Sequence, residues 1–126
     1  MQKIILVTGS RDWTDEKTIA KYMDFVSEKY KKMVLVHGNA SGADKLCEKY
    51  ALSKGWEVRK YPILPLEWKI QGKSAGPKRN QKMIDEETPS VGLVFWKNKS
   101  KGTKDCMNRL YKIIENLEEF HIINDS

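Results

Sequence analysis

Three glycine-containing turns hold the residues of this sequence that are best suited to binding an anion. Each turn follows an apolar run typical of a strand and precedes a helical pattern: Gly9-Ser10-Arg11-Asp12-Trp13, His37-Gly38-Asn39-Ala40-Ser41-Gly42-Ala43-Asp44 and Gly102-Thr103-Lys104-Asp105. Glycine lets the backbone approach a ligand closely, and the N–H groups at the start of a helix attract anions. The composition of these turns therefore predicts a phosphate-binding site.

The side chains of the first and third turns strengthen this prediction. Ser10 offers a hydroxyl, and the guanidinium of Arg11 can bind a phosphate through two hydrogen bonds. Thr103 follows the glycine that opens the third turn. We expect it either to cap the helix and contact a phosphate oxygen, or to act as a helix cap alone.

The second turn is the richest in glycine. Gly38 and Gly42 flank small residues and lead directly into a helix, which predicts exposed N–H groups at the positive end of the helix dipole. Asp44 either complements that dipole or accepts hydrogen bonds from ribose hydroxyls. His37, at the end of a strand, is either structural or a ligand contact.

A fourth segment, Gly76-Pro77-Lys78-Arg79-Asn80-Gln81-Lys82-Met83, adds cations. Arg79 and Lys82 are three residues apart and so share one face of a helix. Asn80 is suited to contacting a base or a sugar. The alternative is a plain helix start, because Pro77 suits the first turn of a helix.

Other nucleotide and metal motifs are absent from the sequence. Gly72-Lys73-Ser74 resembles the end of a P-loop, but that motif requires glycine where this chain has Glu67. No G-x-G-x-x-G fingerprint is present. The two histidines are 84 residues apart and form no zinc-binding pattern, so neither a metal nor a cofactor is predicted.

The elements that must position these turns alternate between strand and helix. Strands are predicted over residues 3–8, 33–36, 56–61, 91–96 and 120–123. Helical periodicity joins them, with one helix predicted from Lys78 to about Asp85 and the segment 62–76 predicted as a loop. This order predicts an α/β fold with an open, mostly parallel sheet of about five strands. Ligands bind such sheets beyond the carboxyl ends of the strands.

Composition points to one soluble domain that spans residues 1–126. The net charge of +6 favours anionic partners, but 19 of the 23 basic residues are lysines spread over the chain, which does not single out nucleic acid. Cys47 and Cys106 fall in apolar helical patterns and are predicted to be buried thiols. No apolar run is long enough for a membrane span, so we expect a cytoplasmic protein with no membrane partner.

Together and in fixed order, the segments VTGSRDW, HGNASGAD, GPKRNQKM and KGTKD resemble the SLOG superfamily, and most closely its small YspA-like (YpsA-related) branch. The resemblance extends from about Ile4 to Leu110. It implies a Rossmann-like three-layer sandwich with strand order 3-2-1-4-5, and binding of nucleotides or nucleotide-derived signals. Members of the superfamily commonly self-associate, which implies a homo-oligomer with Trp68, Trp96 or Tyr111 at a subunit contact.

The superfamily includes the Lonely Guy phosphoribohydrolases, which cleave the base–ribose bond of nucleoside 5′-monophosphates. Arg79 matches their helical arginine. The position of their catalytic glutamate, three residues after Thr103, holds Cys106 here. Cleavage of an N-glycosidic bond needs a carboxylate, and the remaining candidates are Asp105 and Asp44.

The leading hypothesis is a module that binds a nucleotide or a nucleotide-derived signal. The expected ligand contacts are Gly9, Ser10, Arg11, Asp12, Trp13, His37, Gly38, Asn39, Ala40, Gly42, Asp44, Pro77, Arg79, Asn80, Gly102 and Thr103. The alternatives are an N-glycoside hydrolase that uses Arg79 with Asp105 or Asp44, and a nucleic-acid-binding protein related to the DprA branch. The last would stack bases on exposed Trp13 and Trp68.

Overall fold

One parallel five-stranded sheet forms the centre of the protein. The computed structural model describes residues 2–125, and its strands are β1 (Gln2–Gly9), β2 (Lys32–His37), β3 (Glu57–Lys60), β4 (Val91–Lys97) and β5 (Glu119–Asp125). Every neighbouring pair is parallel, and the strand order is β3-β2-β1-β4-β5. The α/β fold and the order 3-2-1-4-5 expected from the sequence are confirmed.

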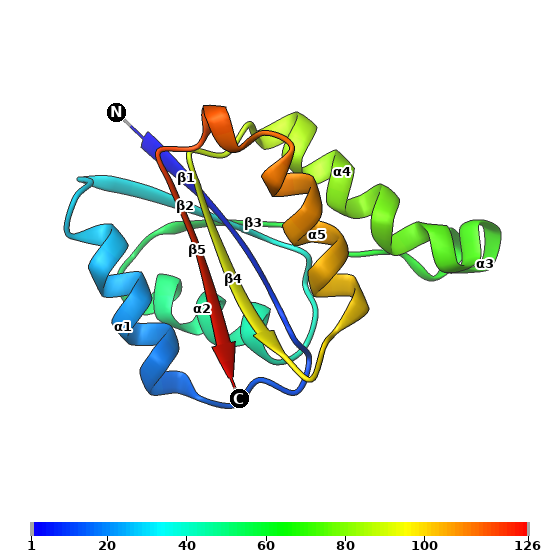
Figure 1. Ribbon diagram of the computed structural model, residues 1–126, viewed down its shortest axis with the longest axis horizontal. Helices are drawn as coiled ribbons and strands as arrows, with labels where there is room; N and C mark the ends of the chain where they lie inside the picture. Colours follow the sequence, from blue (N-terminus) through cyan, green and yellow to red (C-terminus); the bar gives the residue numbers. More distant parts are fainter. Residues whose placement is uncertain (1, 126) are drawn as a thin grey trace.

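Helices cover both faces of the sheet (Figure 1). The helical elements are α1 (Glu16–Ser27), α2 (Ala43–Ser53), α3 (Pro65–Gln71), η1 (Gly72–Ser74), α4 (Ala75–Glu87), α5 (Lys101–Tyr111) and η2 (Ile114–Asn116), where η denotes a 3-10 helix. Helices α1 and α2 pack on one face, and α4 and α5 pack on the other. Helix α3 stands away from the sheet at one end of the molecule (Figure 1).

The apolar runs of the strands are buried because each face of the sheet is covered. In β1, Ile5 and Val7 belong to the core beneath α1 and α2, whereas Leu6 belongs to the core beneath α4 and α5. Phe95 of β4 is fully buried on the first face and packs edge-on against Trp13. A strand covered on both faces has no polar side to expose, which explains the continuous apolar runs in the sequence.

The largest departure from the predicted elements lies between β3 and β4. Residues 62–76 were expected to form a loop, but they contain α3, η1 and the start of α4, which begins at Ala75. None of the residues of α3 is buried, so the helix has no periodic apolar face for the sequence to reveal. Local contacts define it instead: Pro65 occupies its first turn, and Glu67 accepts a hydrogen bond from the N–H of Leu64 at 3.0 Å.

Smaller differences concern the ends of other helices. Asp15 caps α1, because its carboxylate accepts the N–H of Thr18 at 3.1 Å. Helix α4 continues to Glu87, two residues beyond the predicted end near Asp85. Helix α5 ends at Tyr111, so the apolar residues that follow it lie in η2 and the adjoining turns.

Ser10 joins the ends of the two central strands. Its Oγ donates a hydrogen bond to the carbonyl of Lys97 at 2.8 Å and accepts one from the N–H of Lys97 at 2.7 Å. Its carbonyl accepts the N–H groups of Trp13 and Ala43, each at 3.2 Å. The residue is buried and therefore connects β1, β4 and the start of α2.

Replacing Ser10 with alanine is expected to lower the free energy of unfolding by about 1–2 kcal/mol, because a buried N–H and a buried C=O each lose a partner. Urea denaturation measures the change. Ser53→Ala is the matched control, since Ser53 is exposed at the end of α2, and its effect should stay within about 0.5 kcal/mol. Equal effects of the two substitutions would show that the Ser10 side chain does not brace the strands.

Candidate functional site

A cavity of about 410 Å³ lies beyond the carboxyl ends of the strands. The loops that follow β1, β2 and β3 line it, together with α3, η1 and the first turns of α4 and α5. Parallel sheets of this kind bind ligands where the winding direction changes, here between β1 and β4. The volume lies within the range of small-molecule sites in proteins.

Four cationic side chains line the cavity: Arg11, Lys73, Arg79 and Lys101. Within residues 2–125, the side chains of Arg11, Lys73 and Lys101 form no hydrogen bond or ion pair. The single carboxylate in the lining, Asp105, is hydrogen-bonded to Arg109 and Asn80. The cavity therefore carries an excess of positive charge that the described residues do not neutralise.

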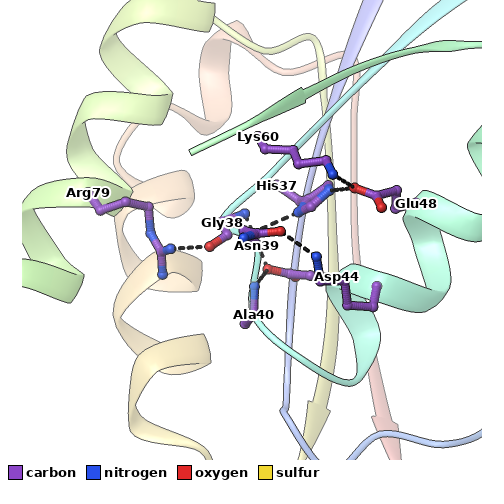
Figure 2. Close-up of polar contacts among 9 residues, drawn as sticks. His37, Gly38, Asn39, Ala40, Asp44, Glu48, Lys60 and Arg79 are labelled. Carbon is purple, nitrogen blue, oxygen red and sulfur yellow. Dashed lines mark hydrogen bonds and ion pairs between the residues drawn. The ribbon is translucent and has the colours of Figure 1, made fainter. Parts of the chain in front are cut away.

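Arg79 extends from α4 across to the turn that follows β2 (Figure 2). Its Nη1 donates to the carbonyl of Gly38 and, at 3.2 Å, to that of Tyr61, and its Nε donates to Oδ1 of Asn80 at 2.9 Å. Within the described chain, Nη2 has no hydrogen-bond partner. Burial lowers the pKa of Arg79, but a guanidinium remains protonated in proteins. Its remaining N–H groups are thus available to an anion.

In the turn after β2, the residues that line the cavity, Gly38, Asn39 and Ala40, have N–H groups already bound within the chain, so these are not the free donors expected there. The N–H groups of Gly38 and Ala40 both donate to Oδ2 of Asp44 at 3.2 Å (Figure 2). Asn39 donates its N–H to Nδ1 of His37 at 2.9 Å. The chain's own carboxylate occupies the anion site at the start of α2, where the helix dipole favours a negative charge. Asp44 was expected either to complement the helix dipole or to accept hydrogen bonds from a ribose. Its contacts within the chain agree with the first role.

Asp44 is almost completely buried and does not line the cavity. Burial raises its pKa to about 7, although the bonds from Ala40 and Gly38 and the nearby charge of Arg79 oppose the rise. Its Oδ1 has no hydrogen-bond partner among the described residues. Asp44 is therefore a buried carboxyl group whose pKa lies well above its ordinary value.

The open helix start at this site belongs to α5. Ser100 caps α5, and its Oγ accepts the N–H of Thr103 at 3.4 Å. The N–H groups of Lys101 and Gly102, which both line the cavity, have no acceptor within residues 2–125. Unpaired N–H groups at the start of an 11-residue helix form a site for an anion. Thr103, expected to act as the cap, is buried and is instead held by Ser100.

The structure brings about half of the predicted ligand contacts to the cavity: Arg11, Gly38, Asn39, Ala40, Pro77, Arg79, Asn80 and Gly102. Asp105, predicted as a catalytic residue, also lines it. Gly9, Ser10, Asp12, Trp13, His37, Gly42, Asp44 and Thr103 do not. The roles of the residues in the cavity as ligand contacts stay predictions.

The predicted residues outside the cavity mostly hold its loops in place. A side chain on Gly42 would overlap the carbonyls of Ser10 and Arg11, and its φ of 74° favours glycine. Trp13 is 2% exposed, so the expectation that it is an exposed stacking surface is wrong. Its indole packs on Phe95 because the turn after β1 folds back over the core.

His37 is a structural residue in this arrangement. It is fully buried, and its Nε2 lies 2.9 Å from Oε1 of Glu48, which also forms an ion pair with Lys60 (Figure 2). Burial lowers the pKa of His37, although the bond to Glu48 opposes this. Since Nδ1 accepts the N–H of Asn39, the neutral ring carries its proton on Nε2 and donates it to Glu48.

The predicted ligand contacts left out six residues that line the cavity: Pro62, Ile63, Trp68, Lys73, Gly76 and Lys101. Of these, Trp68 had been considered only as a stacking residue for nucleic acid or as a subunit contact. Five of them lie within residues 62–76, the segment that was expected to be a loop. The available signal was the length of that segment, because long connections in compact domains are often functional. Nothing in its local pattern indicated which of its residues face the ligand.

Neither candidate carboxylate combines the position and the protonation behaviour of a general acid. Asp105 lines the cavity, but both of its oxygens are hydrogen-bonded, one of them to Arg109 Nε at 2.9 Å. Burial raises the pKa of Asp105, yet the bonds from Arg109 and Asn80 outweigh burial and lower it. Cys106, at the position of the expected glutamate, is fully buried, and burial raises the pKa of its thiol to about 12.

The sequence profile of the YspA, cpYpsA-related SLOG family (YAcAr) matches residues 3–69, just over half of the chain. The chain belongs to this family. The Gene 61 protein of Mycobacterium phage D29 is 33% identical to it over 115 residues, which make up 86% of this chain and 88% of that protein. The SLOG resemblance seen in the four sequence segments is therefore confirmed.

A solved structure with the same fold is that of DNA processing protein A (DprA) from Streptococcus pneumoniae. The two superpose with a TM-score of 0.72 at 20% identity. The match covers 98% of this SLOG chain and 51% of the DprA chain, so this chain spans about half the length of that protein. At this identity the likeness concerns the fold. In residues 2–125, no helix is both long and apolar enough to cross a membrane.

Proposed function

We propose that this SLOG protein binds a phosphate-bearing small molecule, a nucleotide or a nucleotide-derived signal, in the cavity beyond the strand ends. The observation that carries the proposal is the set of cations without internal partners in residues 2–125, Arg11, Lys73 and Lys101, beside Arg79 and the open start of α5. Family membership supports the same ligand class. A cavity of about 410 Å³ suits a mononucleotide better than a long polymer.

The phosphate is expected to lie between Arg79 and the start of α5. Guanidinium groups bind phosphates through paired, charge-assisted hydrogen bonds, and the N–H groups of Lys101 and Gly102 add donors that need no rearrangement. Asn80 and Asn39 lie in the lining and can contact a sugar. The carboxylate of Asp44 already neutralises the second turn, so this turn shapes the cavity instead of holding the phosphate.

Thermal-shift and calorimetric titrations with AMP, ADP-ribose, cyclic nucleotides and ribose 5-phosphate test the proposal. A ligand at about 100 times its dissociation constant stabilises the folded state by about 2.7 kcal/mol, which is a clear shift of the melting temperature. Ribose without phosphate is the control and should not bind. Binding should weaken as salt is added, because the phosphate contacts are electrostatic. The absence of a shift for every phosphate compound at millimolar concentration would contradict the proposal.

Hydrolysis of an N-glycosidic bond is a second candidate, favoured by the carboxylate of Asp105 in the lining. The bonds that lower its pKa suit a permanent carboxylate, which can stabilise an oxocarbenium-like centre but does not supply a proton. Incubation with nucleoside monophosphates and chromatography of the products decide the matter. Release of free base by the wild type but not by the Asp105→Asn variant would establish an enzyme. Binding of the nucleotide without release of its base would establish a binding module.

A nucleic-acid ligand has less support. One of its two expected stacking residues, Trp13, is buried, and the DNA processing protein DprA shares the fold at only 20% identity. A labelled single-stranded oligonucleotide provides the comparison. Affinity for it that exceeds the affinity for mononucleotides at physiological salt would favour the nucleic-acid function.

A further inference from the structure

The cavity has two walls of different chemistry. The loop after β1 and the starts of α4 and α5 supply cations, among them Arg11, Arg79 and Lys101. The segment after β3 and helix α3 supply Pro62, Ile63 and Trp68. A bare phosphate or sugar phosphate uses only the first wall. The second wall offers apolar and aromatic surface, which suits a planar ring better than it suits a phosphate group.

Trp68 differs from the other three tryptophans. Trp13 packs on Phe95, Trp56 packs on Tyr50, and the indole N–H of Trp96 donates to the carbonyl of Ser100. In the described part of the chain, the Trp68 side chain has neither a ring partner nor a hydrogen bond, and it is 43% exposed. Tryptophan is on average a highly buried residue type, so an exposed indole at the wall of a cavity calls for a reason.

Helix α3 does not contribute to the core, because none of its residues is buried. It stands clear of the sheet (Figure 1), and its own capping contacts define its start. Packing therefore gives no reason for a tryptophan at this position. Its place at the cavity does give one, since a planar indole face beside a phosphate site is a surface on which a base can stack.

We propose that Trp68 stacks on the base of the bound ligand, so that the site selects phosphate compounds with a planar aromatic ring over bare sugar phosphates. The inference rests on the proposed function and identifies the residue that makes it specific for nucleotides. The cationic wall holds the phosphate, and α3 holds the ring. Stacking on an aromatic side chain tolerates different bases, because every base has a π face. The residue therefore selects for the presence of a base and not for its identity.

Calorimetry with AMP and ribose 5-phosphate tests the proposal, because the two ligands share the phosphate and the sugar and differ by the base. Trp68→Ala should weaken the binding of AMP by about 10- to 100-fold, and that of ribose 5-phosphate by less than about twofold. Trp68→Phe should retain most of the affinity for AMP. Since α3 buries no residue, the variants should keep the melting temperature of the wild type.

Ile70→Ala is the matched control. Ile70 lies on the same helix, is 73% exposed and does not line the cavity. Its replacement should change neither affinity. As a second readout, AMP should quench part of the tryptophan fluorescence of the wild type, and the quenching should be lost in Trp68→Phe.

Four results would overturn the inference. Equal affinity of the wild type for AMP and ribose 5-phosphate would show that the base is not recognised, while the proposed function would stand. Equal weakening of both ligands by Trp68→Ala would show that Trp68 only shapes the cavity. If Trp68→Ala weakened the binding of a single-stranded oligonucleotide but not that of AMP, Trp68 would belong to a nucleic-acid surface. Failure of the wild type to bind either small ligand would refute both proposals together.

Discussion

Replacing Arg79 with methionine is expected to weaken the binding of AMP and of ribose 5-phosphate by about 30- to 1,000-fold, because both ligands carry the phosphate. Arg79 is the partly buried cation of the cavity, and solvent screens its charge less than it screens the exposed Arg11, Lys73 and Lys101. Methionine approximates the aliphatic stem of arginine and removes the charged guanidinium with its donors. Isothermal calorimetry at low and physiological salt measures the change.

Arg59→Met is the control for the loss of an arginine. Arg59 lies on β3, where it forms ion pairs with Glu57 and Glu87, and it does not line the cavity. Its replacement should leave both affinities within about twofold, as is usual for surface substitutions. Retention of phosphate binding in Arg79→Met would place the phosphate elsewhere in the cavity and would contradict the proposed arrangement.

Gly38→Ala provides an independent test that keeps the charge of Arg79. A methyl group on Gly38 would lie 2.5 Å from Cζ of Arg79, so the guanidinium must move away. The displaced atoms are the end of a flexible side chain, and the fold should therefore survive while phosphate binding falls. Gly76→Ala is the matched control, because Gly76 also lines the cavity and a methyl group there meets nothing within 4 Å. Similar effects of the two substitutions would contradict a role for the position of the guanidinium.

Replacing Asp44 with alanine is expected to lower the free energy of unfolding by about 2–5 kcal/mol. The change leaves the N–H groups of Gly38 and Ala40 without their acceptor, and each buried, unpaired donor costs about 1–3 kcal/mol. It also removes the carboxylate whose charge stabilises the nearby guanidinium of Arg79. Chemical denaturation measures the loss, and a change within about 0.5 kcal/mol would show that the turn does not depend on this carboxylate.

The pH dependence of stability should identify the same residue. Burial raises the pKa of Asp44 from 3.8 to about 7, so the folded state binds a proton more tightly than the unfolded state does. Its contribution to stability is therefore fully present below about pH 4 and is lost as the pH rises to about 7. Over this range, the stability of the wild type relative to the Asp44→Asn variant should fall by as much as about 4 kcal/mol.

The Asp44→Asn variant isolates this titration. The amide that replaces the carboxyl group has no proton to gain or lose in this range, and the other titrating groups are common to both proteins. Asp85→Asn is the control, because Asp85 is exposed on α4 and accepts a hydrogen bond from Gln81. A flat difference for Asp44→Asn would show that Asp44 is ionised throughout the range.

The order of the elements, and the edge of the sheet at which a ligand would bind, could be predicted without coordinates. Apolar runs such as that of β1 and the glycines after them are local features, and local periodicity is sufficient to recognise them. Arg11 and Arg79 could be recognised as candidate phosphate ligands for the same reason. Arg11 lies in a turn and Arg79 lies near a helix start, and both features are visible in the sequence pattern. The shared order of four segments then identified the family.

Which of the three turns is open to an anion depends on the folded chain. All three carry the same local signal, a glycine before a helix, but Asp44 occupies the N–H groups after β2, whereas those of Lys101 and Gly102 remain unpaired within residues 2–125. The difference depends on where a side chain in the first turn of α2 reaches and on how the chain folds back over it. The two bonds are local, spanning six and four residues, but the burial of Asp44 that accompanies them depends on the folded chain.

The positions of Trp13 and Trp68, the two tryptophans that the sequence suggested as stacking surfaces, also follow from tertiary contacts. Trp13 and Trp68 both follow strands in polar surroundings, yet one lies in the core and the other lines the cavity. Trp13 is buried because the turn after β1 brings it over Phe95, a residue distant in the chain. Helix α3 escaped prediction because it buries no residue and leaves no periodic pattern. Contacts between segments remote in sequence set both outcomes, so the fold and the family could be predicted from the sequence, but the shape of the cavity could not.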